Sequence, residues 1–347
     1  MKLVCSKSAL LNGVQIVSKA VPNKTTMSIL ECILLDASRG VITLTANDME
    51  LGIETTIEGN IVEKGIIALD AKIFLEIVRK LPDSDITIET DSSFKTTITC
   101  EKAKPTSSLT HSLKPPSTVP GSEREENISI SQFTLKEVVR QTIFSISDND
   151  NNKLMTGELF DINGNELKVV SLDGHRISIR KIELKENYAP RKVVVPGKTL
   201  NEISKILSGD TDKFVNIFFT PKHIVFEFGN TTVVSRLIEG EYFRIDQMIS
   251  SDYETKVSVN KKEFLSCIDR ATLLVKEGDK KPIIINIGDE VMELKIRSQI
   301  GSMNEEIMIN KEGKDLLIGF NPKFFMVIYT LIFFAIVLWL CFNPGKL

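Results

Sequence analysis

The tetrapeptide Leu69-Asp70-Ala71-Lys72 ends a short apolar strand and opens a helix, and the chain contains two further copies of this element. The copies are Val195-Pro196-Gly197-Lys198 and Phe320-Asn321-Pro322-Lys323, each about 125 residues further on. Asp70 stands where a helix N-cap is expected, and Pro322 takes the first helical position, which tolerates proline. A repeat of this length is a whole domain, since solenoid repeats have periods of roughly 20 to 50 residues. The sequence therefore predicts three similar modules in a row.

An amphipathic helix precedes each copy of this element. Its apolar positions recur at helical spacing in the three modules: Leu10, Val14 and Val17; Leu135, Val139 and Thr142; Phe264, Ile268 and Ala271. Strand-like segments follow, and several of them alternate with the two-residue period of a half-buried sheet. We therefore expect an α+β protein with domains at 1–125, 126–250 and 251–347.

The same patterns predict the individual elements of the first two modules. In the first module we expect helices at 6–20 and 71–81, and strands at 29–36, 41–47, 51–57, 86–90 and 95–100. In the second module we expect helices at 132–146 and 197–207, and strands near 154–162, 166–172, 176–184, 215–220, 223–228 and 231–238.

Two segments break the repeat. Residues 104–122 are rich in proline and small polar residues, so we expect an unstructured loop that completes no ladder. Phe324–Phe342 carries no charge and is long enough to cross a bilayer as a helix, where the two earlier copies continue as amphipathic helices. The simplest interpretation is that both segments are foreign to the fold, for example through shifted reading frames. A membrane tail anchor is the alternative for the second segment.

Composition narrows the compartment and the class of partner. A net charge of −3 in 347 residues argues against nonspecific coating of nucleic acid by the whole surface, but it leaves room for a local basic patch. The five cysteines stand singly without a CxxC pair, which suits a reducing cytosol and neither a disulfide framework nor a zinc site. The N-terminus has no long apolar segment of a signal peptide. We expect a cytoplasmic protein.

Positive charge concentrates on the predicted helices or at their ends. The residues concerned are Lys19, Lys24, Lys72, Arg79, Lys80, Lys136, Arg140, Lys198, Lys205, Lys261, Lys262 and Arg270. Such helices can present one positive surface to a phosphate backbone, although basic residues also solvate outer helix faces with no ligand. Because no base-reading motif is present, any contact with nucleic acid should be nonspecific and sensitive to salt.

No catalytic constellation is visible in the sequence. The most reactive-looking cluster is Ser171–Arg176, but Asp173 and His175 stand two residues apart on a strand or turn and do not face each other. Asp-Gly is a common hairpin signal, so a polar turn between strands is the better interpretation. The phosphate-binding, dinucleotide and zinc-protease motifs are missing, and we expect no catalytic, cofactor or metal site.

Four strings resemble the bacterial DNA polymerase III beta subunits, the sliding clamps. They are TLKEVVRQTIFSIS (134–147), VVSLDGHRISI (169–179), VVVPGKTLNEISKIL (193–207) and SRLIEGEYF (235–243). The resemblance covers 1–103 and 123–323. It implies three clamp-type domains that form a homodimeric ring, with helices lining a central hole and antiparallel sheets outside. The third domain of this chain would be truncated.

The resemblance also implies a function without catalysis. Double-stranded DNA would thread the ring and be held topologically, without sequence preference. A cleft would tether the DNA polymerase III alpha subunit and other proteins with a clamp-binding motif, and a clamp loader would open and close the ring. The alternative from another class is a membrane-tethered, non-enzymatic scaffold anchored by Phe324–Phe342.

The resemblance assigns two sets of site residues. The expected DNA contacts are Lys24, Arg79, Lys80, Lys136, Arg140, Asn149, Lys153 and Lys198. The expected peptide cleft, between the second and third domains, uses Met155, Leu172, Gly174, His175, Arg176, Ile177, Phe243 and Met248. Arg176 would hydrogen-bond the peptide backbone or the cleft wall, whereas packing between domains is the alternative role for the apolar members. The family's terminal strand, which completes the cleft, has no counterpart in this sequence.

Overall fold

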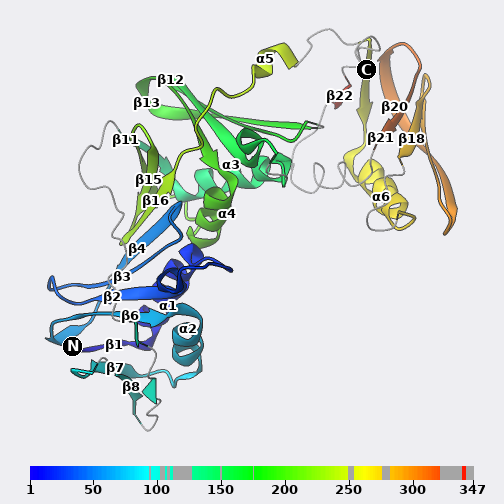
Figure 1. The fold of residues 1–347 in the computed structure, drawn as a ribbon. Coiled ribbons are helices and arrows are strands. Elements are labelled where there is room, and N and C mark those ends of the chain that lie inside the picture. The colour runs from blue at the N-terminus through cyan, green and yellow to red at the C-terminus, as the bar shows by residue number, and fades with distance from the viewer. Residues whose placement is uncertain are drawn as a thin grey trace. The chain divides into compact units, whose positions relative to one another are not determined.

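The structure is a computed structural model that describes residues 1–93, 95–101, 127–148, 151–174, 176–248, 254–275 and 282–320. It also describes the backbone of 106–107, 110–111 and 338–340. The chain forms two compact units, Met1–Gly240 (unit 1) and Glu241–Leu347 (unit 2). Unit 1 holds the first two predicted modules and unit 2 holds the third (Figure 1). The domain boundaries expected at 125 and 250 stay predictions.

The first module begins with a strand and a helix and continues mainly as strands. Its elements are β1 (Lys2–Ser6), α1 (Lys7–Val17), η1 (Ser18–Ala20), η2 (Ser28–Glu31), β2 (Cys32–Asp36), β3 (Ile42–Asn47), β4 (Leu51–Ile57), β5 (Asn60–Glu63), β6 (Ile66–Asp70), α2 (Ala71–Lys80), β7 (Asp85–Thr90), β8 (Thr96–Cys100), β9 (Thr106–Ser107) and β10 (Thr110–His111).

The second module follows the same order of elements. They are β11 (Asn127–Ser131), α3 (Gln132–Thr142), η3 (Ile143–Ser145), η4 (Lys153–Thr156), β12 (Gly157–Leu172), β13 (Ile177–Pro196), α4 (Gly197–Ile206), β14 (Phe214–Phe219), β15 (His223–Phe228) and β16 (Thr231–Arg236). The strand predicted near 154–162 begins only at Gly157, because Lys153–Thr156 form η4. It continues into the strand predicted at 166–172 as the single strand β12, with register shifts on either side of Gly164, whose φ is 61°.

Side-chain caps start most of these helices. Ser6 accepts a hydrogen bond from the backbone N–H of Ala9, and Asp70 accepts one from Ile73 at 2.8 Å. Ser131 does the same for Thr134 at 3.0 Å. Each cap satisfies one of the N–H groups that the first turn of a helix leaves unpaired. The predicted N-cap at Asp70 is therefore confirmed.

One sheet joins the two modules of unit 1. Its nine strands follow the order β10-β6-β2-β3-β4-β16-β15-β14-β11, so the module boundary falls between β4 and β16. These two strands pair antiparallel, and the buried hydroxyls of Thr55 and Thr231 meet at 2.9 Å across the ladder. Helices α1 to α4 lie on one side of unit 1 and the sheets lie on the other (Figure 1). The predicted apolar sets of α1 and α3 are buried in the core between them.

The proline-rich segment 104–122 was expected to complete no ladder, and this expectation is wrong for part of it. The backbone of β9 pairs with β8, and the backbone of β10 pairs with β6. Ladder pairing needs only backbone N–H and C=O groups, and the threonine and serine residues between the prolines supply them at two open sheet edges. The rest of the segment lies outside the described residues.

Unit 2 has a separate core and repeats the pattern of the other modules. Its elements are α5 (Ile245–Met248), β17 (Thr255–Val259), α6 (Lys261–Thr272), β18 (Ile283–Ile287), β19 (Val291–Arg297), β20 (Ser302–Gly313), β21 (Leu316–Phe320) and β22 (Leu338–Leu340). The strand order is β21-β18-β19-β20-β17-β22. Phe264, Ile268 and Ala271 are buried, as the repeat predicts.

Most of the apolar run Phe324–Phe342 lies outside the described residues. The exception is the backbone of β22, which pairs antiparallel with β17 and matches Leu340 to Thr255. This is the place that β7 takes beside β1 and β14 takes beside β11. In the part of the chain that the structure describes, no helix is both long and apolar enough to cross a membrane.

The position of Gly197 yields a stability prediction. The first module has Ala71 at the equivalent position, so the repeat alone would favour alanine there. A Cβ at Gly197 would lie 2.3 Å from Ile146 Cδ1 and 2.9 Å from the backbone oxygen of Thr156. We therefore expect Gly197→Ala to lower the free energy of unfolding by about 1 to 3 kcal/mol, because a rigid backbone atom must move.

Urea unfolding followed by circular dichroism measures this difference. The control is Asn201→Ala on the exposed face of the same helix, which should be neutral or slightly stabilising through helix propensity. A Gly197→Ala protein as stable as the starting protein would show that the contact with Thr156 relaxes freely.

Candidate nucleic-acid and partner interfaces

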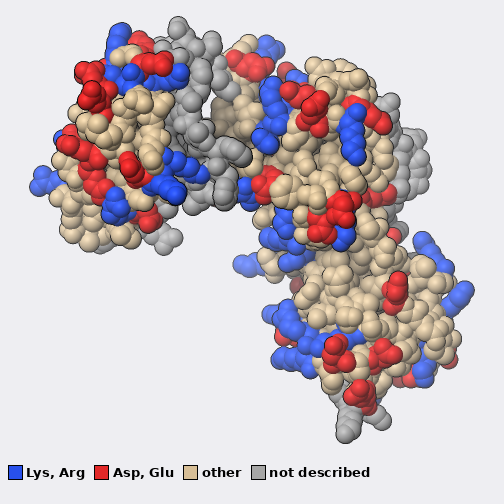
Figure 2. Space-filling view, turned by 180° about the vertical axis from the view of Figure 1, so that it is seen from behind, with Lys and Arg blue, Asp and Glu red and all other residues tan. Residues whose placement is uncertain are grey.

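Of the basic residues predicted to contact DNA, five lie on helices α2, α3 and α4, Lys153 begins η4, and Lys24 lies between η1 and η2. Lys24, Arg79, Lys80, Lys153 and Lys198 are exposed, whereas Lys136 and Arg140 of α3 are half-buried. Figure 2 shows Lys and Arg side chains gathered along the side of unit 1 on which the helices lie. We call these seven residues the basic side. The eighth predicted contact, Asn149, lies outside the described residues.

Several members of the basic side already have partners within the protein. Arg140 donates to both carboxylate oxygens of Glu137, at 2.9 and 2.7 Å, and Arg79 forms an ion pair with Glu76. The Arg140 guanidinium lowers the pKa of Glu137. Lys136 Nζ donates to the carbonyl of Leu207 at 3.2 Å, just beyond the end of α4. A phosphate must therefore share or displace these partners.

Lys198 has a role that the sequence did not predict. Its ammonium group pairs with Asp48 in the β3–β4 turn, so that it ties the second module to the first. The Asp48 side chain is only 6% exposed, and its carboxylate also accepts the backbone N–H groups of Glu50 and Leu51 at 3.0 and 2.7 Å. The repeat carries a signal for this residue, because Asp173 occupies the same turn position 125 residues later.

The Asp-Gly element at 173–176 is a hairpin turn, as predicted. Leu172 pairs with Ile177 at the end of the β12–β13 ladder, and Gly174 has a φ of 87°, which favours glycine. The Asp173 carboxylate accepts from the backbone N–H of Arg176 at 3.1 Å and from its Nε at 2.9 Å. Asp173 therefore holds an arginine, which sequence reasoning missed. His175 lies outside the described residues.

The ladder brings four of the predicted cleft residues to one end of this hairpin: Leu172, Gly174, Arg176 and Ile177. Leu172 is buried, whereas Ile177 is 36% exposed and offers an apolar contact. Met155 lies in η4, which contacts β12, and its carbonyl accepts from the N–H of Ser147 at 2.8 Å.

The last two predicted cleft residues, Phe243 and Met248, belong to unit 2. Phe243 is half-buried and meets Tyr242 edge to face, with ring centroids 5.6 Å apart. Met248 is 52% exposed at the end of α5. Their role beside the hairpin residues stays a prediction.

A buried polar cluster lies behind the hairpin end. Ser171 Oγ donates to the carbonyl of Thr142 at 2.6 Å, and the Thr142 hydroxyl donates to Glu158 Oε2 at 3.0 Å. Glu158 is fully buried, and its Oε1 has no hydrogen-bond partner among the described residues. Burial raises the pKa of Glu158 to about 8, because the charged form loses its hydration and gains only one hydrogen bond. The carboxyl group is therefore mostly protonated at neutral pH.

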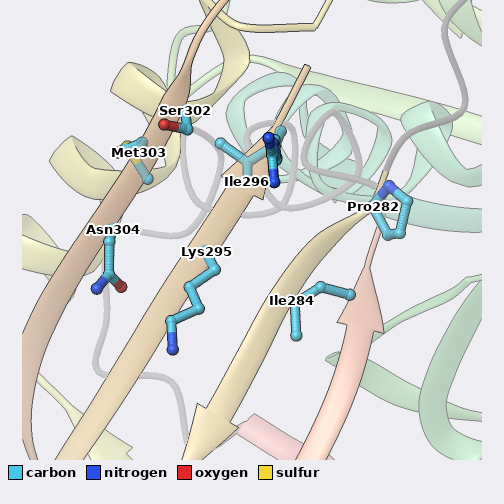
Figure 3. Close-up of a pocket in the computed structure, with 8 residues that line it drawn as sticks. Pro282, Ile284, Lys295, Ile296, Ser302, Met303 and Asn304 are labelled. Atoms are coloured by element: carbon cyan, nitrogen blue, oxygen red, sulfur yellow. The ribbon is translucent and has the colours of Figure 1, made fainter.

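A hollow of about 490 Å³ lies on the sheet of unit 2 (Figure 3). Its lining residues are Pro282, Ile284, Lys295, Ile296, Arg297, Ser302, Met303 and Asn304. Lys295 forms an ion pair with Glu293 at 2.6 Å on β19. The hollow is lined by none of the residues predicted for DNA or partner binding.

Three family models match the chain in succession. The N-terminal, central and C-terminal domains of the DNA polymerase III beta subunit match residues 1–113, 129–243 and 246–332. The chain belongs to the DNA polymerase III beta subunit family, the sliding clamps. The C-terminal match extends to residue 332 and so includes the first part of the apolar run Phe324–Phe342, which interrupts the repeat.

Individual relatives agree with this assignment. The chain is 34% identical to the beta sliding clamp of Staphylococcus epidermidis, covering 94% of this chain and 89% of that protein. It is similar to a solved DNA polymerase III beta subunit from Eubacterium rectale, at 70% identity and a TM-score of 0.94, covering 96% of this chain and 91% of that one. The sliding clamp of Bacillus subtilis gives 33% identity and a TM-score of 0.92 with the same coverage.

Membership of the family confirms the prediction of three clamp-type domains and of a non-catalytic processivity factor. The alternative of a membrane-tethered scaffold has no support among these relatives. The clamp family therefore explains the repeat that the sequence shows, including its third copy in unit 2.

The raised pKa of Glu158 predicts that the stability of the protein falls as the pH rises. Its pKa is about 4.5 in an unfolded chain and about 8 in the fold, so the folded state binds the proton more tightly. The contribution of protonated Glu158 to the free energy of unfolding is fully present below pH 4.5. It is lost as the pH rises to 8, by up to about 1.4 kcal/mol for each pH unit. We expect Glu158→Gln to remove this decline and to be more stable than the starting protein at pH 8.

Chemical denaturation at several pH values between 5 and 8 checks the Glu158 prediction. Glu166→Gln serves as the control, because Glu166 is a surface carboxylate paired with Lys181 and should leave the slope unchanged. If the starting protein and Glu158→Gln show parallel slopes, Glu158 is ionised in the fold or titrates normally.

Proposed function

We propose that the basic side of unit 1 faces double-stranded DNA inside a homodimeric ring. The support is that five of the cationic residues lie on α2, α3 and α4. Lys and Arg side chains gather along the side of unit 1 on which these helices lie (Figure 2). The relatives named beta sliding clamp support the same function. The ring would hold the DNA topologically, so that the protein contacts need not be strong.

The internal partners of the basic side are compatible with a ring that slides along duplex DNA. Arg140 already binds Glu137, Arg79 binds Glu76 and Lys198 binds Asp48, so a phosphate contact of any of these three residues replaces an internal interaction. The net gain for each contact is therefore small, and no contact depends on base identity. Weak and exchangeable contacts allow the ring to move along the duplex without a deep energy minimum.

We further propose that the hairpin end binds the peptide segments of partner proteins. Arg176, fixed by Asp173, would hydrogen-bond the peptide, and Ile177 would contact an apolar anchor. Leu172, Gly174 and Met155 would form the adjoining wall, whereas the part of His175, Phe243 and Met248 in binding stays a prediction. The partners are the DNA polymerase III alpha subunit, the clamp loader and other proteins that carry clamp-binding peptides.

The proposed location is the cytoplasm, where DNA replication takes place in bacteria. Cys5, Cys32, Cys100 and Cys267 are buried free thiols. Burial raises the pKa of Cys5 and Cys267 to about 12, which keeps these thiols protonated and unreactive. Such thiols suit a reducing compartment.

Neutralising exposed members of the basic side should weaken DNA binding in a salt-dependent way. The double variant Arg79→Gln, Lys80→Gln should bind duplex DNA more weakly at low salt. Its slope of log K against log salt concentration should become shallower by about 0.9 for each phosphate that the variant no longer neutralises. Fluorescence anisotropy with a labelled duplex measures both quantities.

Lys181→Gln is the matched control for DNA binding. Lys181 is an exposed lysine on the β12–β13 hairpin, paired with Glu166, and its replacement should leave the slope unchanged. Equally weakened binding in the double variant and in Lys181→Gln would indicate a response to net charge alone and contradict the proposed DNA surface.

An acidic side chain at Ile177 should disrupt partner binding. Ile177→Asp places an unpaired charge where an apolar anchor should pack, and we expect the affinity for the polymerase III alpha subunit to fall by about 30-fold or more. Surface plasmon resonance measures the affinity. Ile179→Asp is the control, since Ile179 is 37% exposed on the same strand and face, two residues further from the turn. Equal effects at both positions would argue against a site at the hairpin end.

A further inference from the structure

Arg176 is held from two directions. Its Nε donates to Asp173 Oδ2 at 2.9 Å, and its guanidinium carbon lies 5.6 Å from the ring centroid of Phe144. The Arg176 side chain is only 18% exposed, so these interactions are largely shielded from water. A cation over an aromatic face is worth more in such surroundings than at an exposed site.

The segment that carries Phe144 is itself anchored to both strands of the hairpin. Ser145 and Ser178 share a buried hydrogen bond of 2.6 Å between their hydroxyls. On the other side, the carbonyl of Thr142 accepts from Ser171 Oγ, also at 2.6 Å. Ser171 directly precedes Leu172, and Ser178 directly follows Ile177. These two bonds therefore fix Phe144 relative to both strands at the turn end of the hairpin.

We propose that Phe144 is a positioning residue for partner binding, which acts by holding the Arg176 guanidinium in the orientation that meets the peptide. This inference rests on the proposed function of the hairpin end. Asp173 binds Arg176 at Nε, so the tilt of the guanidinium plane depends on the other contacts of the side chain. The ring supplies the second surface that restricts this tilt, so less side-chain entropy remains to be lost when the peptide binds.

The electrostatic nature of the contact separates this role from simple packing. Phe144→Leu and Phe144→Met keep an apolar side chain but remove the aromatic face, whereas Phe144→Tyr keeps the face. We expect the first two variants to bind the purified polymerase III alpha subunit about 3- to 10-fold more weakly, in line with a partly shielded cation–π contact. Phe144→Tyr should bind like the starting protein.

A double-mutant cycle with Arg176→Ala tests the link between the two residues. In the Arg176→Ala background, Phe144→Leu should change the affinity by less than about twofold, because the group that it positions is gone. The Arg176 Nε–H resonance gives a second readout, since the ring current of Phe144 should shift it and Phe144→Leu should abolish the shift. Thermal melting of each variant establishes that it is folded.

The outcomes separate this inference from the function on which it rests. If Arg176→Ala binds the alpha subunit normally, the proposed role of the hairpin end fails. If Arg176→Ala binds weakly while Phe144→Leu binds normally, only the positioning role is overturned. Equal decreases in affinity from Phe144→Leu in both backgrounds would also overturn it, because Phe144 would then act independently of Arg176.

Discussion

The antiparallel pairing of β4 with β16 is the interaction on which the architecture of unit 1 depends. It turns the sheets of two modules into one sheet of nine strands, and it includes a buried hydroxyl pair between Thr55 and Thr231. Because this sheet continues across the module boundary, the helices of both modules lie on the same side of unit 1 (Figure 1). The basic residues of α2, α3 and α4 then lie on this side, and the ion pair between Lys198 and Asp48 links the two modules.

The same hairpin turn serves different purposes in the two modules. In the first module, Asp48 accepts backbone N–H groups and binds Lys198 from the second module, which stabilises the module junction. In the second module, Asp173 accepts a backbone N–H group and binds Arg176 of its own turn. Met49 and Gly174 both have positive φ at the next position, with values of 78° and 87°. The backbone geometry that the two modules share thus allows one carboxylate to tie the modules and the other to orient Arg176.

The last turn of α3 and the following η3 turn connect the two proposed interfaces. Arg140 lies on the basic side, and Thr142, two residues later, bonds to the strand that ends at Leu172. Phe144 then reaches the arginine of the partner site. The buried carboxyl of Glu158 adds a polar group beneath this connection, at a cost that protonation reduces. This short stretch therefore combines buried hydrogen bonds with contacts to residues of both proposed interfaces.

Much of the fold could be predicted from the sequence, because the residue patterns that specify its elements are local and occur in all three modules. Helix caps, the apolar spacing of α1, α3 and α6, and the Asp-Gly turn all depend on neighbours within one or two turns. The short backbone pairings of β9 and β10 could not be predicted from such local patterns. The strands β9 and β10 lie in a segment whose composition predicts a loop, and they exist because distant sheet edges offer unpaired backbone groups.

The same distinction, between local sequence information and tertiary contacts, applies to the candidate sites. The sequence by itself determined which residues carry charge and which lie at the hairpin end, since residue type and spacing decide both. Only the tertiary structure decided what these residues touch: Lys198 meets Asp48, Arg176 meets Phe144, and Glu158 is enclosed with one hydrogen bond. The two members of each pair lie on different elements or turns and are separated along the chain. Their interaction energies depend on distance and burial, which chain packing creates and residue order alone does not show.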